Sequence, residues 1–273
     1  MLERGTSMSR QRFTIKTFFE SLDVAFSMYS SIPVPHILWN EQNMKYMLGF
    51  FPLIGLVQAV FLMLWVFLSQ RLEINPVLFA AVATLIPLIV TGGIHMDGFC
   101  DTVDALSSHQ TREKKLEILK DSNSGAFAVI GCASYLLLTF ALWTQPQEEN
   151  RMITAQIMSI GYVLSRSMSA LSVVHFPCAK NSGLAHSFSC AAQKKRVGII
   201  ATVFILLCAV CLLCVHLWYG LAVCIACACV FLFYYRMSMK QFGGITGDLA
   251  GYFLQINELT ILLMSVCIGI FVK

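Results

Sequence analysis

Seven long apolar runs constrain the fold of this chain more than any other feature of its sequence. A helix of about 20 apolar residues spans the roughly 30 Å hydrocarbon core of a bilayer, and lipid offers no partner to a free backbone amide. Each run is therefore predicted to be a membrane-spanning helix, and the fold class to be all-α, a polytopic bundle of about seven transmembrane helices. The runs cover residues 46–69, 76–95, 124–144, 153–174, 197–215, 217–235 and 250–272.

Composition supports a single membrane domain over residues 1–273. Hydrophobic residues make up 57% of the chain and charged residues only 12%, about half the charged fraction of a soluble domain. Residues 1–45 precede the bundle of residues 46–272, and their first residues do not resemble a signal peptide. Apolar and charged side chains alternate at helical spacing over Thr14 to Ser31, which predicts an amphipathic helix lying in the membrane interface.

The distribution of Lys and Arg predicts which side of the membrane each connection faces. Cytoplasmic loops are enriched in these residues, and fifteen fall on one side of the seven predicted spans against three on the other. The N-terminus is therefore expected inside and the C-terminus outside. The inside set is Arg4, Arg10, Arg12, Lys16, Lys45, Arg112, Lys114, Lys115, Lys120, Lys180, Lys194, Lys195, Arg196, Arg236 and Lys240, and the outside set is Arg71, Arg151 and Lys273.

Two function classes are disfavoured by the composition. The net charge of +4 is explained by the inside loops, so no nucleic-acid partner is expected. Six of the eleven cysteines lie in the fifth and sixth apolar runs, where cysteine behaves as a small hydrophobe. The cysteines are therefore not expected to form disulfides or a metal site.

The segment from Thr91 to Asp104 contains the residues most indicative of chemistry. Asp97, Asp101 and Asp104 are spaced i, i+4 and i+7, which places three carboxylates on one stripe of a helix. Such a cluster with access to water favours Mg²⁺, which also bridges substrate phosphates. The alternative is a helix end whose acids face water. The preceding pair Gly92-Gly93 permits close backbone approach.

A second acidic group belongs to the last apolar run. Asp248 stands just before the run and Glu258 lies within it. A carboxylate inside a membrane is costly, so Glu258 is a functional candidate by default. Its alternative role is an ion pair with Arg166, the only basic residue within a predicted span, and such a pair would not exclude a role at the site.

The stretch Leu116 to Gly125 carries a third set of candidates. Lys120 could contact a phosphate and Asp121 could reach a metal, or both could be solvated charges at a helix end. The serine, asparagine and glycine residues before the third apolar run are typical of a helix N-terminus, which offers free N–H groups to an anion.

Three stretches together resemble a known family in their order and spacing: GGIHMDGFCDTVDA (92–105), LEILKDSNSG (116–125) and GGITGDLAGYFLQINE (243–258). The family is the cobalamin synthases, also called adenosylcobinamide-GDP ribazoletransferases. The similarity spans most of the chain. It also includes Ile32–Pro35, Phe51–Gly55 and the pair Ser165-Arg166.

The resemblance implies a Mg²⁺-dependent enzyme embedded in the bacterial cytoplasmic (inner) membrane, with its active site facing the cytoplasm. It would join adenosylcobinamide-GDP to α-ribazole or α-ribazole 5′-phosphate, releasing GMP and forming adenosylcobalamin or its 5′-phosphate. This is a late step in assembling the nucleotide loop of cobalamin. The implied partners are these substrates and the lipid bilayer, and a homo-oligomer is left open.

We assign provisional roles to the candidate residues on this basis. Asp97, Asp101 and Asp104 are expected to ligate one or two Mg²⁺ ions on the diphosphate, with Asp248 completing the site. A hydroxyl nucleophile benefits from a general base, and His95 and Glu258 are the candidates. His95 should lie about 160° from Asp97 around a continuous helix, so the alternative for it is a helix-end histidine with no catalytic role. The catalytic set is then His95, Glu258 and Asp104, and the substrate-binding set is Lys120, Asp121, Ser122, Arg166, Gly92 and Gly93.

Three other functions remain as alternatives. A CDP-alcohol phosphotransferase or a polyprenyl transferase would use similar acidic motifs, but the first expects Ala-Arg where this chain has Cys100-Asp101, and the Asn-Asp start of the second is absent. An ion-coupled transporter could use Arg166 and Glu258 as a relay, but the paired interrupted helices typical of transporters are not evident in the sequence.

Overall fold

The computed structural model describes residues 14–35, 38–179 and 192–271. The described residues form ten helices, and their only β-type pairing is an isolated parallel bridge between Cys178 and Ile245. The predicted all-α fold is confirmed. The helices are α1 (Ile15–Tyr29), α2 (Glu41–Arg71), α3 (Pro76–Thr91), α4 (Ile94–Ser107), α5 (Arg112–Ile118), α6 (Ala126–Trp143), α7 (Glu148–His175), α9 (Lys194–Val215), α10 (Leu217–Gln241) and α11 (Gly247–Phe271).

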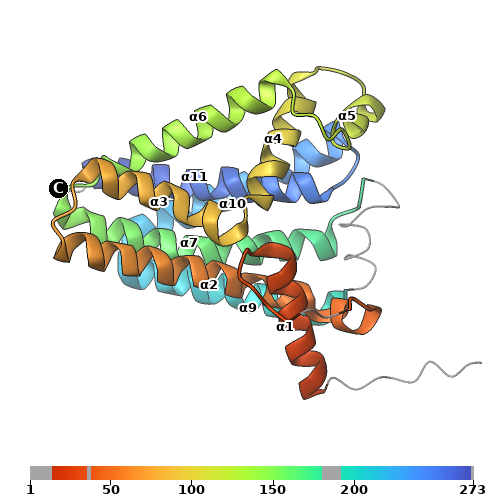
Figure 1. Ribbon diagram of the computed structural model, residues 1–273, viewed down its shortest axis with the longest axis horizontal. Coiled ribbons are helices and arrows are strands. Elements are labelled where there is room, and N and C mark those ends of the chain that lie inside the picture. Colours follow the sequence, from red (N-terminus) through yellow and green to blue (C-terminus); the bar gives the residue numbers. More distant parts are fainter. Residues whose placement is uncertain (1–13, 36–37, 180–191, 272–273) are drawn as a thin grey trace, which may run out of the picture.

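The long helices lie side by side along one axis of the molecule (Figure 1). Six of them, α2, α6, α7, α9, α10 and α11, are long and apolar enough to cross a membrane. The pair α3 and α4 meets the same test together, as a broken span bent by 96°. The chain is therefore a multi-pass membrane protein with six or seven crossings. Helices α1, α4 and α5 gather toward the end of the bundle opposite the C-terminal end of α11 (Figure 1).

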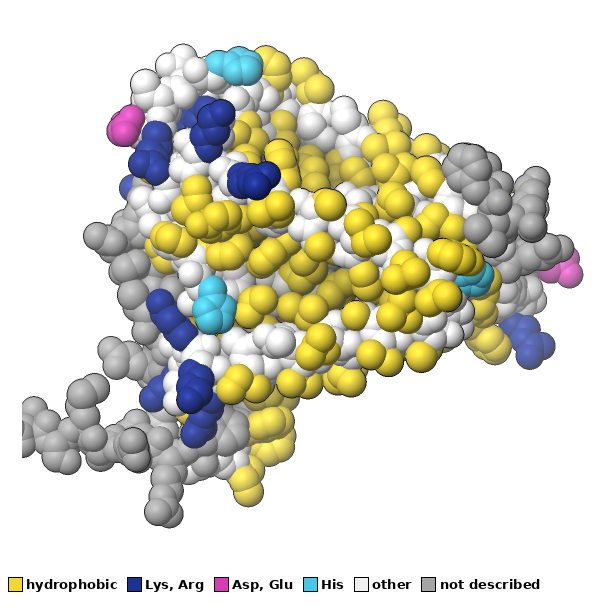
Figure 2. Space-filling model, turned by 180° about the vertical axis from the view of Figure 1, so that it is seen from behind, with side chains coloured by type: hydrophobic (Ala, Val, Ile, Leu, Met, Phe, Trp, Pro, Cys, Tyr) yellow, Lys and Arg dark blue, Asp and Glu magenta, His cyan; other side chains and the backbone are white. Residues whose placement is uncertain are grey.

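Helix α7 forms the centre of the bundle, and α6, α9 and α10 form much of its outer wall. Most of the apolar stretch of α7 is buried inside the protein, whereas most of the corresponding stretches of the other three helices is not. Large apolar side chains such as Ile130, Leu206 and Ile225 point outward, and Figure 2 shows apolar side chains over the wall of the bundle. A surface of this kind is suited to lipid.

Most of the described Lys and Arg residues lie at the end of the bundle that carries α4 and α5. Figure 2 shows these side chains gathered mainly at one end of the face in view. Arg71 and Arg151 lie at the opposite end, at the last residue of α2 and in the first turn of α7. This distribution follows the predicted inside and outside sets. Arg4, Arg10, Arg12, Lys180 and Lys273 lie outside the described residues.

The second apolar run is not one continuous helix, and the prediction of a helix over 76–95 was wrong in its last turn. Helix α3 ends at Thr91, and both Gly92 (φ 63°) and Gly93 (φ 78°) take left-handed conformations. Glycine adopts this conformation without a Cβ penalty and commonly ends a helix in this way. The Ser31 amide donates to the Val90 carbonyl at 2.9 Å, which satisfies one of the carbonyls freed at the end of α3.

The connection expected over 96–123 is largely helical. Helix α4 carries the acidic segment across the end of the bundle, and α5 follows it (Figure 1). Helix α5 is attached to the end of α10. The Lys115 ammonium donates to the Gln241 side chain, and Arg112 donates to the Met239 carbonyl at 3.3 Å. Cations are favourable beside the free carbonyls of a helix C-terminus.

The helix predicted over Thr14 to Ser31 is present as α1. It packs on α2 through aromatic contacts, with ring centroids 4.9 Å apart for Phe18 and Phe50 and 4.4 Å apart for Tyr29 and Phe51. Ile15 and Phe19 are exposed. An apolar exposed face fits the predicted position in the membrane interface.

Candidate active site

Four aspartates from two helices form an acidic cluster at the end of the bundle. Asp97, Asp101 and Asp104 lie on α4, and Asp248 lies in the first turn of α11. Asp101 interacts electrostatically with the other three carboxylates. The structure therefore brings together all four residues that the sequence predicted as metal ligands. Like charges at this spacing repel, and a bound cation would relieve the repulsion.

Two glycines allow α4 and α11 to approach at backbone contact. A Cβ atom at Gly98 would lie 2.8 Å from the Asp248 Cα, and one at Gly251 would lie 2.9 Å from the His95 carbonyl oxygen. Real side chains do not tolerate such contacts with backbone atoms. The close packing of these helices, and with it the position of Asp248 beside the α4 aspartates, therefore depends on glycine at both positions.

Thr246 fixes the start of α11. Its hydroxyl oxygen accepts from the Leu249 amide at 3.2 Å and lies 3.3 Å from Asp248 Oδ2. The approach to this turn is held by the bridge to the end of α7, where the Ile245 amide donates to the Pro177 carbonyl at 2.9 Å. Asp248 thus lies in a helix start that is held by the Thr246 cap and by the bridge to the segment after α7.

Asp104 lies at the N-terminus of α6. Its carboxylate fills the space that a side chain at Gly125 would occupy, and Gly125 is the N-cap residue of α6. The free amides of a helix N-terminus favour a negative charge. The N-terminus of α6 therefore stabilises the negative charge of Asp104 without a metal. The roles of Asp104 as metal ligand and catalytic residue remain predictions.

The carboxylates do not form a closed metal cage. Within the described residues, no three His, Cys, Asp or Glu side chains are arranged to hold one ion. Mg²⁺ does not require such a cage, because it usually keeps several waters and binds one or two carboxylates together with substrate phosphates. The hard oxygen donors of the cluster fit an open Mg²⁺ site that a diphosphate substrate would complete.

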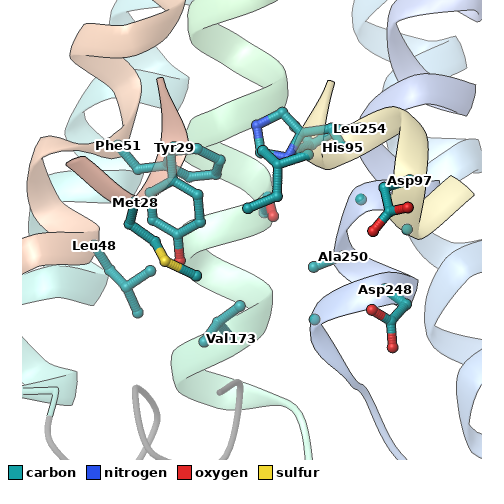
Figure 3. Close-up of a pocket in the computed structure, with 15 residues that line it drawn as sticks. Met28, Tyr29, Leu48, Phe51, His95, Asp97, Val173, Asp248, Ala250 and Leu254 are labelled. Atoms are coloured by element: carbon teal, nitrogen blue, oxygen red, sulfur yellow. The ribbon is translucent and has the colours of Figure 1, made fainter. Parts of the chain in front are cut away.

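A pocket of about 230 Å³ opens beside the cluster, between α1, α2, α4, α7 and α11. Its walls differ in chemistry (Figure 3). Asp97 and Asp248 lie on one side, apolar and aromatic residues lie on the other, and His95 and Leu254 stand between them. The apolar side consists of Met28, Tyr29, Leu48, Phe51 and Val173. Nothing in the sequence indicated that these five residues meet beside the aspartates, because they come from three separate helices.

His95 is buried in the wall of this pocket, with 5% of its surface exposed. Its ring stacks on Tyr29 at 6.1 Å and meets Phe51 edge-on at 5.6 Å. Its Nε2 atom is buried and has no hydrogen-bond partner within the described chain. His95 stands between the apolar and acidic sides in Figure 3, and it lines the same pocket as Asp97. The predicted opposite orientation does not separate His95 from the acidic site.

Glu258 and Arg166 form an ion pair deep in the bundle. Arg166 Nη1 donates to Glu258 Oε1 at 2.6 Å and to the Tyr162 carbonyl at 3.0 Å, and both side chains are almost completely buried. The predicted pairing is confirmed. Glu258 lies ten residues after Asp248 on α11, which is about 15 Å along the helix, so it does not line the pocket. Its role as a base and the substrate-binding role of Arg166 stay predictions.

Three of the predicted substrate-binding residues lie in an exposed turn after α5. Lys120, Asp121 and Ser122 are all exposed. Asn123 donates to Asp121 Oδ1 from its backbone amide at 3.0 Å and from its side chain at 2.9 Å, and these hydrogen bonds hold the pKa of Asp121 below its usual value. The turn continues into Ser124.

Ser124 connects this turn to the acidic cluster. It lines an open groove together with Asp97, Cys100 and the predicted substrate-binding pair Gly92 and Gly93. Ile94 and Asp97 line both this groove and the His95 pocket, so Asp97 borders both spaces. Beyond its place before a helix N-terminus, nothing in the sequence indicated that Ser124 would line this groove.

Comparisons with known proteins agree with the resemblance noted in the sequence. Residues 21–266 match the family described as cobalamin-5-phosphate synthase. A protein of Lachnoclostridium phytofermentans named adenosylcobinamide-GDP ribazoletransferase is 42% identical over 242 residues, covering 89% of this chain and 91% of its own. A Clostridium perfringens protein of the same name is 32% identical over 254 residues, covering 92% of this chain and 100% of its own. No solved structure matches the chain.

The family match covers most of the chain, including α4, the turn after α5 and the start of α11. The acidic cluster and the pocket beside it therefore lie within the matched region. The chain belongs to the cobalamin-5-phosphate synthase family.

Proposed function

We propose that this chain transfers the phosphocobinamide group of adenosylcobinamide-GDP to α-ribazole or α-ribazole 5′-phosphate. The products are GMP and adenosylcobalamin or its 5′-phosphate. The family and the names of its relatives support this reaction. The observation that carries it is the acidic cluster of α4 and α11 beside a pocket with one acidic and one apolar wall.

Mg²⁺ is the proposed cofactor. Bound to the diphosphate, it would neutralise the charge of the phosphoryl oxygens and of the departing GMP. Asp97, Asp101 and Asp248 would hold it, and Asp104 would contribute from the N-terminus of α6. This donor set is made of hard oxygens and stands where water and substrate phosphates have access, which are the conditions Mg²⁺ prefers.

The transfer itself requires a positioned hydroxyl. The ribose hydroxyl of the acceptor attacks the phosphorus attached to cobinamide, a new P–O bond forms, and the bond to the leaving GMP breaks. His95 is the better candidate to receive the hydroxyl proton because it lines the same pocket as Asp97 and Asp248. Glu258 is the weaker candidate because its carboxylate already accepts a hydrogen bond from Arg166.

The second substrate-binding region would be the groove that runs from Gly92 and Gly93 past Asp97 to Ser124. The diphosphate and its GMP half would lie along it, because the exposed turn containing Lys120, Asp121 and Ser122 stands just before Ser124. Lys120 would act as a point charge on a phosphate. Arg166 would act indirectly, since it is buried and paired with Glu258.

The proposed cellular setting is the bacterial cytoplasmic (inner) membrane. The N-terminus and the acidic cluster would face the cytoplasm, since the cluster lies at the Lys- and Arg-rich end of the bundle. Both substrates are water-soluble and phosphorylated or glycosylated, which fits a site at that end.

An assay of GMP release tests this proposal. Protein purified in detergent is mixed with adenosylcobinamide-GDP, α-ribazole and Mg²⁺, and GMP and the corrinoid product are quantified. We expect both products in equal amounts, with no membrane gradient required. Product formed only from a CDP-alcohol would support the phosphotransferase alternative, and absence of turnover together with gradient-driven uptake would support the transporter.

A further inference from the structure

The pocket beside the acidic cluster has two chemically different sides. Asp97 and Asp248 form the acidic side, and the opposite side is made of aliphatic and aromatic side chains (Figure 3). An occupant that satisfies both sides needs an apolar flat part joined to a polar part. A metal or phosphate alone would leave the apolar side empty.

The volume of the pocket limits what can enter it. Sites for whole drug-sized ligands measure about 300–1,000 Å³, whereas this pocket measures about 230 Å³. It therefore fits one fused ring system and not a corrin macrocycle. Tyr29, Phe51 and His95 all line the pocket and pack on one another with ring centroids 4.4 to 6.1 Å apart. They form one aromatic wall, and a further aromatic ring can stack on such a wall or meet it edge-on.

Polarity distinguishes between the two ring systems that the proposed reaction supplies. Guanine carries several donors and acceptors, and burying them without partners costs free energy at each group. Among the five residues of the apolar side only Tyr29 carries a strong polar group, its hydroxyl, and Ser169 and His95 are the uncharged polar side chains elsewhere in the described lining. The dimethylbenzimidazole of ribazole has two methyl groups and only one free ring nitrogen, so it matches these walls.

We infer that the side of the pocket lined by Met28, Tyr29, Leu48, Phe51 and Val173 binds the aromatic base of the ribazole acceptor. The base would lie between Phe51 and Val173, and the ribose would extend toward Asp97 and Asp248. This inference rests on the proposed function. Leu254 lies six residues after Asp248 on α11, about 9 Å along the helix, so the pocket is deep enough for a base to lie below a ribose at the acidic rim.

A competition between two acceptors in one reaction tests the inference. Purified protein receives adenosylcobinamide-GDP, Mg²⁺ and an equal mixture of α-ribazole and the riboside of unsubstituted benzimidazole. The ratio of the two products reports the relative kcat/KM values, and it does not depend on how much of the protein is folded. A methyl-sized change in an apolar pocket shifts such ratios by roughly tenfold or more.

Two variants change the pocket in opposite directions. Val173→Phe fills it, so the ratio of dimethylated to unsubstituted product should fall about tenfold. Leu48→Ala enlarges it, so a bulkier naphthimidazole riboside competing against α-ribazole should gain about tenfold. Val60→Phe and Leu56→Ala are matched controls, because both residues are on α2 and point outward, with 59% and 52% of their surfaces exposed. Neither control should move either ratio.

Selectivity for the nucleotide half of the donor tests the alternative that the pocket binds guanine. The same variants are given a mixture of adenosylcobinamide-GDP and its adenosine analogue, and released GMP and AMP are compared. The inference predicts an unchanged donor ratio. Variants that shift the donor ratio but leave the acceptor ratios unchanged would assign the pocket to guanine and overturn the inference. Acceptor ratios that match wild type in both pocket variants would also overturn it.

These experiments distinguish a failure of this inference from a failure of the proposed function. If the wild-type protein releases no GMP with either acceptor, the proposed function fails. If the wild-type protein turns over α-ribazole but the pocket variants keep its selectivity, only the assignment of the base to this pocket fails.

Discussion

Two sets of charged residues differ at the residue scale: Arg166 and Glu258 are buried, whereas Asp97 is exposed and Asp101 and Asp104 are partly buried. Arg166 and Glu258 neutralise each other at 2.6 Å. By contrast, within the described residues, Asp97, Asp101 and Asp104 form no ion pair with Lys or Arg. The first arrangement stabilises a fold, and the second leaves negative charge available to a ligand. This difference is the residue-level reason for assigning the chemistry to the aspartates.

The ion pair gives a prediction about stability. Removing one partner leaves an uncompensated buried charge, so Glu258→Leu and Arg166→Leu should each destabilise the protein by about 3–5 kcal/mol. The double variant should be more stable than either single variant. Thermal unfolding in one detergent measures all three. If the single variants are as stable as the wild type, the stability prediction is wrong. If they have also lost all turnover, the pair has a role in the reaction.

At the scale of elements, the site depends on how closely α4 and α11 pack. Asp248 reaches the α4 aspartates because Gly98 and Gly251 leave room for the partner backbone. The glycine pair at 92 and 93 then sets the direction of α4 through its 96° bend from α3. The position of the acidic cluster therefore depends on these four glycines.

Gly98→Ala tests the helix packing. The added methyl would lie 2.8 Å from the Asp248 Cα, so the helices must separate, at a cost of about 1–3 kcal/mol. We expect a large loss of GMP release and a lower unfolding temperature. Gly269→Ala on α11 is the control, since the atom nearest to its added methyl is the Tyr219 hydroxyl, the end of a side chain, at 3.1 Å. Equal activity of the two variants would show that the close approach is not needed.

Substitutions of two adjacent lysines test whether α5 is attached to α10 through Lys115. Lys115 is buried and donates to Gln241, whereas Lys114 is exposed and pairs only with Glu117 at 2.8 Å. Lys115→Ala should destabilise the protein by about 1–3 kcal/mol, because it leaves a charge-assisted hydrogen bond unmade. Lys114→Ala should cost less than about 1 kcal/mol, as exposed pairs do. Unfolding temperatures compare them, and equal losses would mean that α5 is not anchored through Lys115.

At the scale of the whole molecule, much of the architecture follows from the sequence. The apolar runs predicted the crossings because lipid leaves the backbone no alternative to a helix, and the i, i+4, i+7 spacing predicted that the aspartates share a helix. The direction of α4 was not predictable, since it depends on two left-handed glycines in sequence. The aromatic pocket was not predictable either, because Tyr29, Phe51 and Val173 meet only through tertiary packing.

The membrane orientation is a prediction of its own at this scale. A periplasmic reporter enzyme fused after Gln145 or after the C-terminal residue should be active, and one fused after His109 or after Gly243 should be inactive. A fluorescent reporter that matures only in the cytoplasm should give the opposite pattern at the same four positions. Activity of the periplasmic reporter after His109 would place the acidic cluster on the outer side and contradict the orientation.

The Mg²⁺ dependence of GMP release in aspartate variants tests the central claim most directly. Turnover is measured against Mg²⁺ concentration for the wild type, Asp97→Asn, Asp101→Asn and Asp248→Asn, with the exposed Glu113→Gln on α5 as the control. We expect each asparagine variant to need at least about tenfold more Mg²⁺ for half-maximal turnover, since removing even an outer partner of a metal ligand costs about 10–100-fold in affinity. The control should match the wild type. Asparagine variants with wild-type turnover and wild-type Mg²⁺ dependence would contradict the assignment of the site.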